Sequence, residues 1–398
     1  MKVCMVAYSF YESDNRVMRY AEALAARGDQ VDVLSLARND YAKVETINGV
    51  TVHRIQKRDK NERGKLSYLK RLLVFLARSS WYLATKHGRY PYDLIHVHSV
   101  PDFEVFAALI PKIAGAKVIL DIHDIVPEFY ASKFGVSKDS LAFQALKLIE
   151  RGSAAFSDHV IIANHLWEKV LTARSVASSK CTTYLNYPDS RMFNAARRTR
   201  SADGRIILLY PGTINWHQGL DIAIKAFDII KNEVPEAEFH IYGEGNLKEQ
   251  LTRMIEERSL QKRIKLMNFL PLCEIAQIMA NADIGIVPKR DDAFGGEAFS
   301  TKIFEFMALG VPVIAANTRI DRFYFNDSLV KFFQAGDERS LADAMLTMIH
   351  NHKLREDLAS NAITYIAGQS WDIKKHDYLN LVDGLVLKIP NTGKSKVQ

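Results

Sequence analysis

Short apolar runs alternate along this chain with longer segments in which apolar residues recur at helical spacing. The runs at Lys2–Ala7 and Val31–Leu34, joined by a helical pattern that ends at Gly28, form a strand–helix–strand unit. Further patterns in the first half predict strands at Val52–Ile55, Leu94–His98, Val118–Asp121 and Val160–Ala163, and helices at Phe103–Ile113 and Leu141–Phe156. Uninterrupted apolar strands separated by helices are typical of a parallel sheet with both faces covered.

The same alternation starts again after a polar segment. The second half predicts strands at Ile206–Tyr210, Phe239–Tyr242, Ile264–Met267, Ile284–Val287 and Val313–Ala315. We therefore expect an α/β fold of two Rossmann-like, doubly wound domains that face each other across a cleft. The expected parts are an N-terminal domain at 1–190, a linker at 191–204 and a second domain at 205–370, with an amphipathic helix at 371–388 as a candidate for packing back on the first domain.

Composition narrows the class of protein. A length of 398 residues favours two domains, and 48% hydrophobic with 25% charged residues is typical of a globular protein. We expect neither a membrane span nor a signal peptide, because no long uncharged apolar run is present. The three scattered cysteines cannot all form disulfides, so we expect a protein of the reducing cytoplasm. They also lack metal-ligand spacing, so we expect no bound metal. The first strand–helix turn has no G-x-G-x-x-G sequence, which argues against a dinucleotide cofactor.

Positive charge is concentrated in the first half, most densely at residues 54–89. This segment has 11 Lys and Arg residues but only two acids, and its second part has helical apolar spacing. A basic amphipathic helix can lie on an anionic membrane surface, which would make the protein peripheral at the membrane. The alternative is an ordinary helix that packs its apolar side on the sheet. We expect no nucleic-acid partner, because no recognition motif is present and the second half is slightly acidic.

The stretch Phe294–Ala315 combines a turn, a helix and a strand. The paired glycines at 295 and 296 precede a helical pattern that stops near Gly310. A helix N-terminus after such a turn offers backbone N–H groups and a positive dipole end to an anion such as a diphosphate. Glu297 and Glu305 lie on either side of that N-terminus and can hold two ends of one ligand. The alternative is a glycine-rich loop before a buried helix.

Polar residues also follow two strands of the first half. His123 and Asp124 come directly after the apolar run at Val118–Asp121, in the position where parallel sheets place functional residues. An imidazole beside a carboxylate can bind sugar hydroxyls or position an acceptor hydroxyl, so both are candidate catalytic residues. We expect His96 and His98, which lie within a strand, to be packed structural residues.

These motifs, in this order, resemble glycosyltransferase family 4, a family of retaining, nucleotide-sugar-dependent enzymes with the GT-B fold. Glu297 and Glu305 resemble its two glutamates separated by seven residues. The other pieces are Asn186–Asp189 at the domain junction, Gly212–Gly219 with Ala226–Phe227, Tyr242–Gly245, and His123–Asp124. The resemblance extends over nearly the whole chain.

The resemblance implies roles for the residues around the helix N-terminus. Glu305 would accept hydrogen bonds from the two ribose hydroxyls of the donor, and Glu297, a candidate catalytic residue, would bind the donor sugar. Phe299, Ser300 and Thr301 would present backbone N–H groups to the sugar and diphosphate. Gly212, Thr213 and Gly243 are the corresponding candidates in the glycine-containing loops, and His123 would contact the sugar from the other domain.

The resemblance also implies the reactants. The donor would be a UDP- or GDP-linked sugar, and the acceptor a glycan or a lipid-linked glycan in cell-surface polysaccharide or glycolipid synthesis. No cofactor and, as a rule in this fold, no divalent cation would be needed. Two alternatives remain open, a non-catalytic sugar-nucleotide-binding module and an epimerase with the same fold.

One departure from the family concerns the diphosphate. Many relatives carry an arginine and a lysine at the positions that Thr213 and Gln218 occupy here. Another cation must then neutralise the diphosphate. We expect Lys302 to do so, because it lies beside the predicted backbone N–H groups, with Lys289 and Arg290 as further candidates.

Overall fold

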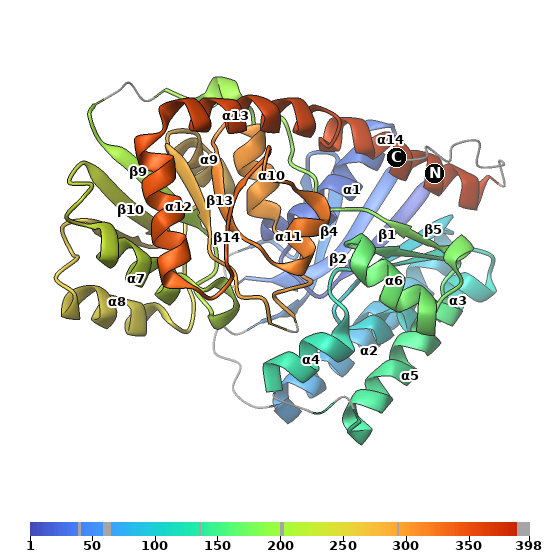
Figure 1. Cartoon of the computed structure of the whole chain (residues 1–398). Helices are drawn as coiled ribbons and strands as arrows, with labels where there is room; N and C mark the ends of the chain where they lie inside the picture. Colours follow the sequence, from blue (N-terminus) through green and yellow to red (C-terminus); the bar gives the residue numbers. More distant parts are fainter. Residues whose placement is uncertain are drawn as a thin grey trace. The chain divides into compact units, whose positions relative to one another are not determined.

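The computed structural model describes residues 1–38, 41–58, 65–134, 137, 139–199, 203–292 and 294–387 (Figure 1). The chain divides into two compact units, one of Met1–Asn186 with the segment from Lys374 onward, the other of Tyr187–Ile373. The boundary thus falls before the predicted end of the first domain at residue 190, and the predicted linker at 191–204 lies within the range of the second unit. Each unit is described by itself below.

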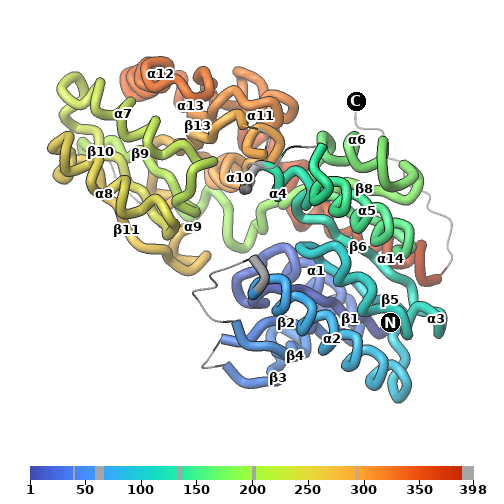
Figure 2. The backbone as a smooth tube through the Cα atoms, turned by 90° about the horizontal axis from the view of Figure 1, so that it is seen from below, coloured from blue at the N-terminus to red at the C-terminus, as the bar shows by residue number. Residues whose placement is uncertain are grey.

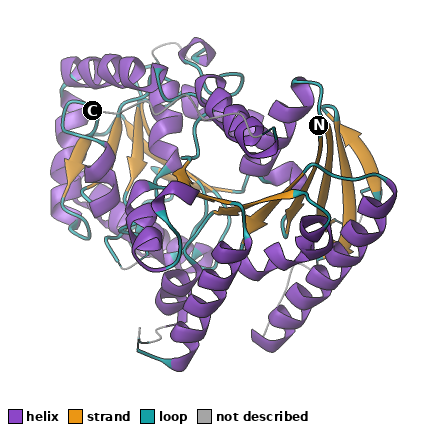
Figure 3. Ribbon diagram, turned by 90° about the vertical axis from the view of Figure 1, so that its right-hand side faces the viewer, coloured by secondary structure: helices purple, strands orange, loops and turns teal. Residues whose placement is uncertain are grey.

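The first unit is built on an eight-stranded sheet. Its strands are β1 (Lys2–Ala7), β2 (Gln30–Ala37), β3 (Val44–Ile47), β4 (Val50–Lys57), β5 (Leu94–Ser99), β6 (Lys117–Ile122), β7 (His159–Ile162) and β8 (Cys181–Thr183). The strand order is β3-β4-β2-β1-β5-β6-β7-β8, and every neighbouring pair is parallel except β3 and β4. Figure 3 shows the strands with helices flanking them.

Helices cover both faces of this sheet. They are η1 (Tyr11–Ser13), α1 (Asn15–Ala26), α2 (Lys65–Arg89), η2 (Asp102–Ala108), α3 (Leu109–Ile113), α4 (Val126–Phe134), α5 (Leu141–Phe156), α6 (His165–Arg174), η3 (Ser178–Lys180) and α14 (Trp371–Val386). Helices α1 and α14 lie on one side of the sheet, and α2, α3 and α5 lie on the other (Figures 1 and 2). The buried ring of Tyr378 anchors α14, because it packs at a tilt against Tyr20, with the ring centres 4.3 Å apart, and its hydroxyl lies 2.9 Å from Nδ1 of His96.

Two features of this unit differ from the sequence prediction. The helix expected at Phe103–Ile113 is mostly the 3-10 helix η2, followed by the single short α-helix α3. The β3–β4 hairpin was missed, although its Asn48-Gly49 turn is a strong hairpin signal. Both turn residues have positive φ, 49° and 81°, as a two-residue hairpin loop requires.

The second unit has a six-stranded, fully parallel sheet in the order β11-β10-β9-β12-β13-β14. Its strands are β9 (Ile206–Pro211), β10 (Ala237–Tyr242), β11 (Ile264–Met267), β12 (Ile284–Val287), β13 (Val313–Ala316) and β14 (Lys331–Phe333). Its helices are η4 (Ala195–Arg197), η5 (Trp216–Gln218), α7 (Leu220–Ile230), α8 (Lys248–Glu257), α9 (Leu272–Ala280), α10 (Thr301–Ala308), α11 (Arg319–Tyr324), α12 (Glu338–His350) and α13 (His352–Ala367).

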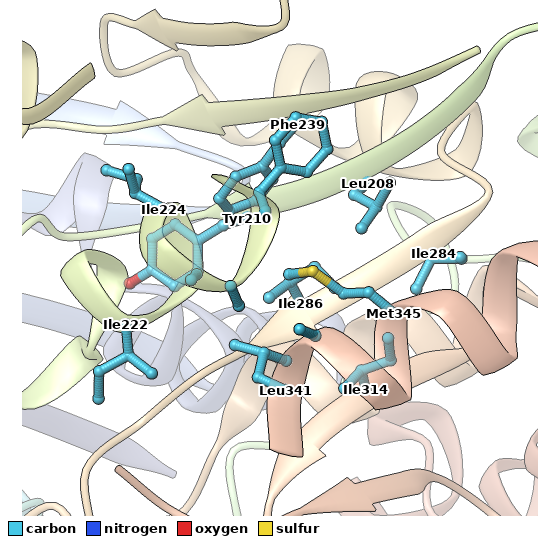
Figure 4. Close-up of a cluster of buried hydrophobic side chains, with 14 of the residues drawn as sticks. Leu208, Tyr210, Ile222, Ile224, Phe239, Ile284, Ile286, Ile314, Leu341 and Met345 are labelled. Carbon is cyan, nitrogen blue, oxygen red and sulfur yellow. The ribbon is translucent and has the colours of Figure 1, made fainter. Parts of the chain in front are cut away.

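The core of this unit joins the sheet to helices α7 and α12. Figure 4 shows Tyr210 and Phe239 of the sheet together with Ile222 of α7 and Met345 of α12. The strand order reverses between β9 and β12, which is where open α/β sheets bind ligands. The loops that carry most of the predicted donor-site residues follow these two strands.

Two sequence predictions concern the whole chain. The prediction of two α/β sheets built from parallel strands is confirmed. Within the described part of the chain, none of the helices is both long enough and apolar enough to cross a membrane.

Candidate functional site

Glycines let the loops after β9, β10 and β12 come into direct backbone contact in the second unit. A Cβ atom on Gly243 would lie 1.8 Å from the carbonyl oxygen of Gly212. Gly212 has φ of +139°, which side-chain-bearing residues rarely adopt. A Cβ atom on Gly219, at the start of α7, would lie 2.0 Å from the carbonyl oxygen of Pro288. Only glycine fits at these positions, so they fix the shape of the predicted donor site.

The N–H groups of the paired glycines in the Phe294–Ala315 stretch are hydrogen-bonded within their own turn. The N–H of Gly295 donates to Oδ1 of Asp292 at 2.6 Å, and that of Gly296 donates to the Asp292 carbonyl oxygen at 2.8 Å. The side chain and the carbonyl group of Asp292 therefore take up both glycine N–H groups. The groups available for an anion begin farther along, at the start of α10.

The N-terminus of α10 is open. Ser300 is its N-cap residue, but the hydroxyl of Ser300 makes no capping bond and contacts Asp321 Oδ2 at 3.2 Å. Within the described part of the chain, no protein acceptor is found for the N–H groups of Phe299, Ser300, Thr301 and Lys302. We call these four N–H groups the α10 amide nest. Such a group of amides at the positive end of a helix dipole is suited to a phosphate group.

Lys302 extends from the α10 amide nest to the loop after β9. Its Nζ atom lies 3.2 Å from Oε1 of Gln218 and 5.2 Å from the centre of the Tyr210 ring. The missing side chain of Gly212 makes room for it, because a Cβ atom there would lie 2.5 Å from Cε of Lys302. Burial lowers the pKa of Lys302 to about 8, although the charge of Glu305 acts in the opposite direction.

Thr213 and Gln218 are held in the same loop. The buried hydroxyl of Tyr210 lies 2.8 Å from the Thr213 carbonyl oxygen and 2.9 Å from Oε1 of Gln218. The same Gln218 oxygen accepts a hydrogen bond from the Lys302 ammonium group. The amide side chain of Gln218 therefore holds the end of the Lys302 side chain in place.

Lys289 is a buried structural cation. Its Nζ atom donates to the Ala298 carbonyl oxygen at 2.7 Å and to the Ser300 hydroxyl at 2.8 Å, and it lies 3.1 Å from Oδ2 of Asp321. Burial lowers the pKa of Lys289, although the charge of Asp321 opposes this effect. Lys289 therefore fixes the segment that carries the α10 amide nest.

Arg290 is held by an ion pair and an aromatic ring, at the contact between the loop after β12 and α7. Its guanidinium makes a two-pronged ion pair with Asp221 of α7, at 2.9 and 2.7 Å, and lies 3.5 Å from the centre of the Trp216 ring. These contacts hold η5 against the start of α7. Among the described residues, Lys302 thus has the fewest hydrogen-bond acceptors of the three candidate cations.

The two glutamates lie at opposite sides of the α10 amide nest. Oε1 of Glu297 accepts a hydrogen bond from Arg319 at 2.7 Å. Glu305 is partly buried on α10, one helical turn beyond Thr301. Gly310 ends this helix with φ of +68°, and Phe306 and Met307 fix it to the sheet because their side chains are fully buried.

A second group of polar residues lies in the first unit, at the end of β6. Asp121 is fully buried, and its two oxygens each receive a 2.7 Å hydrogen bond from the Arg16 guanidinium. Nδ1 of His98 and Nε2 of His123 lie 3.1 and 3.2 Å from Oδ2 of the same carboxylate. We call Arg16, His98, Asp121 and His123 the Asp121 cluster. His123 is its most exposed member, with 23% of its side-chain surface accessible.

The electrostatics of the Asp121 cluster are those of a closed ion pair. Burial raises the pKa of Asp121, but the charges of Arg16 and His123 and the hydrogen bonds from His123 and His98 together outweigh burial and hold this pKa well below its usual range. Burial lowers the pKa of His98, which favours the neutral ring. Burial raises the pKa of Asp124, although His123 and Arg16 act against this effect.

The first unit also brings together three potential metal ligands. His96, His98 and Asp121 offer ligand atoms that lie within 4.8 Å of one another. However, the guanidinium of Arg16 already contacts both carboxylate oxygens of Asp121. A second cation would have to displace it, so we interpret the group as an ion pair with packed histidines, and His96 and His98 are buried as the sequence predicted.

Two family models match the chain. The model described as a glycosyl transferase 4-like domain matches residues 13–186, and the model described as glycosyl transferases group 1 matches residues 193–365. The chain belongs to the family 4 glycosyltransferases. The predicted family, and with it a transferase class of enzyme, is confirmed.

Individual relatives of this glycosyltransferase agree. The amylovoran biosynthesis glycosyltransferase AmsK of Erwinia amylovora is 29% identical over 154 residues, which are 38% of each chain. The match thus spans less than half of that relative. Sucrose-phosphate synthase from Thermosynechococcus elongatus has a TM-score of 0.79 at 16% identity, covering 98% of this chain and 100% of that one. HepE from Anabaena, solved with UDP, has a TM-score of 0.72 at 17% identity, covering 97% and 100%. These likenesses show the GT-B fold.

Sequence reasoning about this glycosyltransferase missed three residues that organise the two sites. Arg16 and Asp121 form the centre of the Asp121 cluster, and Asp321 holds Lys289 under the α10 amide nest. The available signal was a charged residue inside an apolar pattern. Asp121 closes an apolar strand and Arg16 precedes the first apolar position of α1, and such charges are buried only when paired.

Proposed function

We propose that this protein is a retaining glycosyltransferase that moves a sugar from a UDP- or GDP-sugar to a hydroxyl of a glycan or lipid-linked acceptor. The observation that carries the proposal is the open α10 amide nest with the Lys302 ammonium beside it. Amides and a single cation match a diphosphate, the part of the donor that bears its charge. HepE, a protein of the same fold, was solved with UDP, which supports a nucleotide donor.

The cation at this site supports a diphosphate ligand in a particular way. The resemblance to family 4 implies that many relatives carry a lysine where this chain has Gln218, and the Lys302 ammonium lies 3.2 Å from Oε1 of that glutamine. In this chain the positive charge for the diphosphate would thus come from Lys302 of α10, and not from a lysine in the loop after β9. Lys289 and Arg290 support the two walls of the site through Asp321 and Asp221.

We assign the other predicted residues as follows. Glu305 accepts hydrogen bonds from the ribose hydroxyls, and Glu297, held by Arg319, binds the donor sugar. Gly212, Thr213 and Gly243 shape the loops around the diphosphate. His123, supported by Asp121, contacts the substrate from the first unit, and Asp124 lies next to it.

The reaction breaks the bond between the anomeric carbon and the diphosphate oxygen. The acceptor oxygen forms a new bond to the same carbon, on the same face in a retaining reaction, and its proton passes to the departing diphosphate. The amides and Lys302 stabilise the negative charge that develops on the diphosphate as it leaves. The protein thus acts by positioning and charge stabilisation, without a divalent cation or a covalent intermediate.

The proposed acceptor rests on a named relative, and the proposed location rests on the charge of one segment. The relative AmsK is named for amylovoran biosynthesis, which supports a polysaccharide or glycolipid acceptor here. We propose a cytoplasmic, peripheral enzyme whose segment 54–89 contacts an anionic membrane. Residues 59–64 of this segment lie outside the described residues.

The test is turnover of a panel of UDP-, GDP- and ADP-sugars by the full chain, with and without a simple glycoside acceptor and in the presence of a chelator. We expect slow hydrolysis of one nucleotide class and none by Glu305→Ala, whose exposed-site control is Glu249→Ala. Tight binding of a nucleotide sugar without any turnover would favour the non-catalytic module. Conversion of the donor sugar without release of nucleotide would favour the epimerase.

A further inference from the structure

Exposed apolar side chains gather on one side of the first unit. The side is formed by α2, η2, α3 and α5, which lie next to one another on the same face of the sheet (Figure 2). Twelve of the 22 large apolar side chains that are exposed in the described chain lie on these elements. They are Tyr68, Leu69, Leu73, Val74 and Trp81 of α2, Phe106, Leu109, Ile110 and Ile113 of η2 and α3, and Leu141, Leu148 and Ile149 of α5.

The exposure is not explained by the packing of the helices on the sheet. Helix α2 buries a different set of side chains, including Leu72, Phe75 and Leu83, so most of its exposed apolar residues are not needed for packing on the sheet. Ile113 and Leu148 are 76% and 67% accessible. Contiguous apolar surface of this kind marks an interaction site in proteins that are otherwise well packed.

The charges on the same elements have one sign. The acids of η2, α3 and α5 are Asp102, Glu104 and Glu150, and all three are buried. Burial raises the pKa of Asp102 to about 7 and that of Glu104 to about 8, which weakens their negative charge further. The exposed charged side chains described on these four elements are Lys70, Arg78, Arg89 and Arg151, all basic. Asp139, in the turn before α5, is exposed but lies outside the four elements.

We propose that these exposed apolar and basic side chains of α2, η2, α3 and α5 form one docking face for an anionic lipid bilayer. The face reaches well beyond the segment 54–89, because η2, α3 and α5 together supply seven of its twelve apolar side chains. The apolar side chains enter the boundary between headgroups and acyl chains, and the cations pair with lipid phosphates. A second copy of the chain fits less well, since the two basic surfaces would repel each other.

A cavity at the edge of α2 adds a place for a headgroup. It has a volume of about 770 Å³ and is lined by Trp81 and Arg78 of α2 and by Lys43 and Lys57 of the β3–β4 hairpin and its edges. The apolar part of its wall and the three cations match a phosphate group attached to a lipid. The docking face therefore has basic side chains among its apolar residues and further basic side chains in the cavity beside α2.

The experiment measures partition of the full chain onto vesicles. Wild type should bind vesicles of equal phosphatidylglycerol and phosphatidylcholine, bind pure phosphatidylcholine vesicles at least tenfold more weakly, and be released by high salt. Ile113→Ser with Leu148→Ser, both outside 54–89, should weaken binding at least tenfold. The matched control is Ile229→Ser with Phe269→Ser, two residues of the second unit that are 49% and 66% accessible, and it should bind within twofold of wild type.

Three results would overturn the proposal: no binding of wild type to the anionic vesicles, equal binding by the Ile113/Leu148 variant, or a wild-type dimer that this variant dissociates. If that variant does not fold, Arg78→Gln with Arg151→Gln tests the same face and should reduce binding to the anionic vesicles. Hydrolysis of nucleotide sugars without vesicles is measured in parallel. Because it does not involve the docking face, failure of the proposed enzyme activity and failure of the proposed face give different results.

Discussion

The two polar sites of this protein differ in how their charges are used. In the Asp121 cluster of the first unit, the charge of Arg16 is taken up by Asp121, and three side chains share that one carboxylate. At the α10 amide nest of the second unit, the amides have no protein acceptor within the described chain, and Lys302 contacts only an uncharged amide oxygen at hydrogen-bond distance. The first arrangement stabilises the fold, and the second leaves binding capacity for a ligand. Substitutions should therefore affect stability at one site and turnover at the other.

The largest expected effect is on stability. Arg16→Met leaves the buried Asp121 carboxylate without its main partner, and we expect the free energy of unfolding at neutral pH to fall by about 3–5 kcal/mol. The pKa of Asp121 is depressed in the folded state, so this stabilisation is present above the ordinary carboxyl pKa and is lost as the pH falls. Denaturant unfolding at pH 7 and at about pH 2, well below the ordinary carboxyl pKa of about 3.9, should show the deficit shrinking in acid.

A surface ion pair is the control for this prediction. Arg322 and Asp327 form an ion pair whose side chains are 42% and 73% accessible, and Arg322→Met should cost less than about 1 kcal/mol. A similar small loss for Arg16→Met would mean that the Asp121 cluster is not a stabilising ion pair.

The next effect is on turnover. Lys302→Ala removes the cation from the α10 amide nest, and we expect kcat/KM for sugar transfer to fall by about 10²-fold with little change in stability. Because burial lowers the pKa of Lys302 to about 8, the free enzyme loses this charge as the pH rises, and kcat/KM should decline above about pH 8. Lys302→Arg should remove that decline, because arginine stays charged.

The control and the rescue for Lys302 are both available in the chain. Lys225 forms a surface ion pair with Glu338, and Lys225→Ala should leave turnover unchanged. Adding Gln218→Lys to Lys302→Ala places a cation where relatives carry one and should restore part of the activity. Full activity of Lys302→Ala alone would contradict the assignment of Lys302 to the diphosphate.

The smallest expected effect concerns the one member of the Asp121 cluster that is also a proposed substrate contact. His123 belongs to the Asp121 cluster but is partly exposed, so His123→Gln should leave the Arg16–Asp121 pair intact and reduce turnover about tenfold, the loss of one hydrogen bond to substrate. His240→Gln, in the second unit, is the control. If His123→Gln destabilises the protein as strongly as Arg16→Met, then His123 is a structural residue and not a substrate contact.

The sequence by itself determined the architecture and predicted the location of the proposed donor site. Apolar runs and helical spacing are local properties, and burial against a sheet enforces them, so β1, β9 and β13 appear where the sequence predicts strands. The positions of Glu297 before α10 and Glu305 within it were likewise predicted from the sequence, because the turn and the helix follow each other along the chain. The short strands β8 and β14 were missed, since runs of three residues carry little periodic signal.

Only the tertiary structure decided what each charge does. The sequence places Lys302 ahead of Lys289 and Arg290 only by its position. Their different roles arise because Asp321, Asp221 and Gln218, which are remote along the chain, contact them in the fold. The docking face has the same origin, since nothing local shows that Asp102, Glu104 and Glu150 are buried while Ile113 and Leu148 are exposed. Periodicity reports which residues share a face of one element, whereas the free energy of a charge depends on what other elements bring to it.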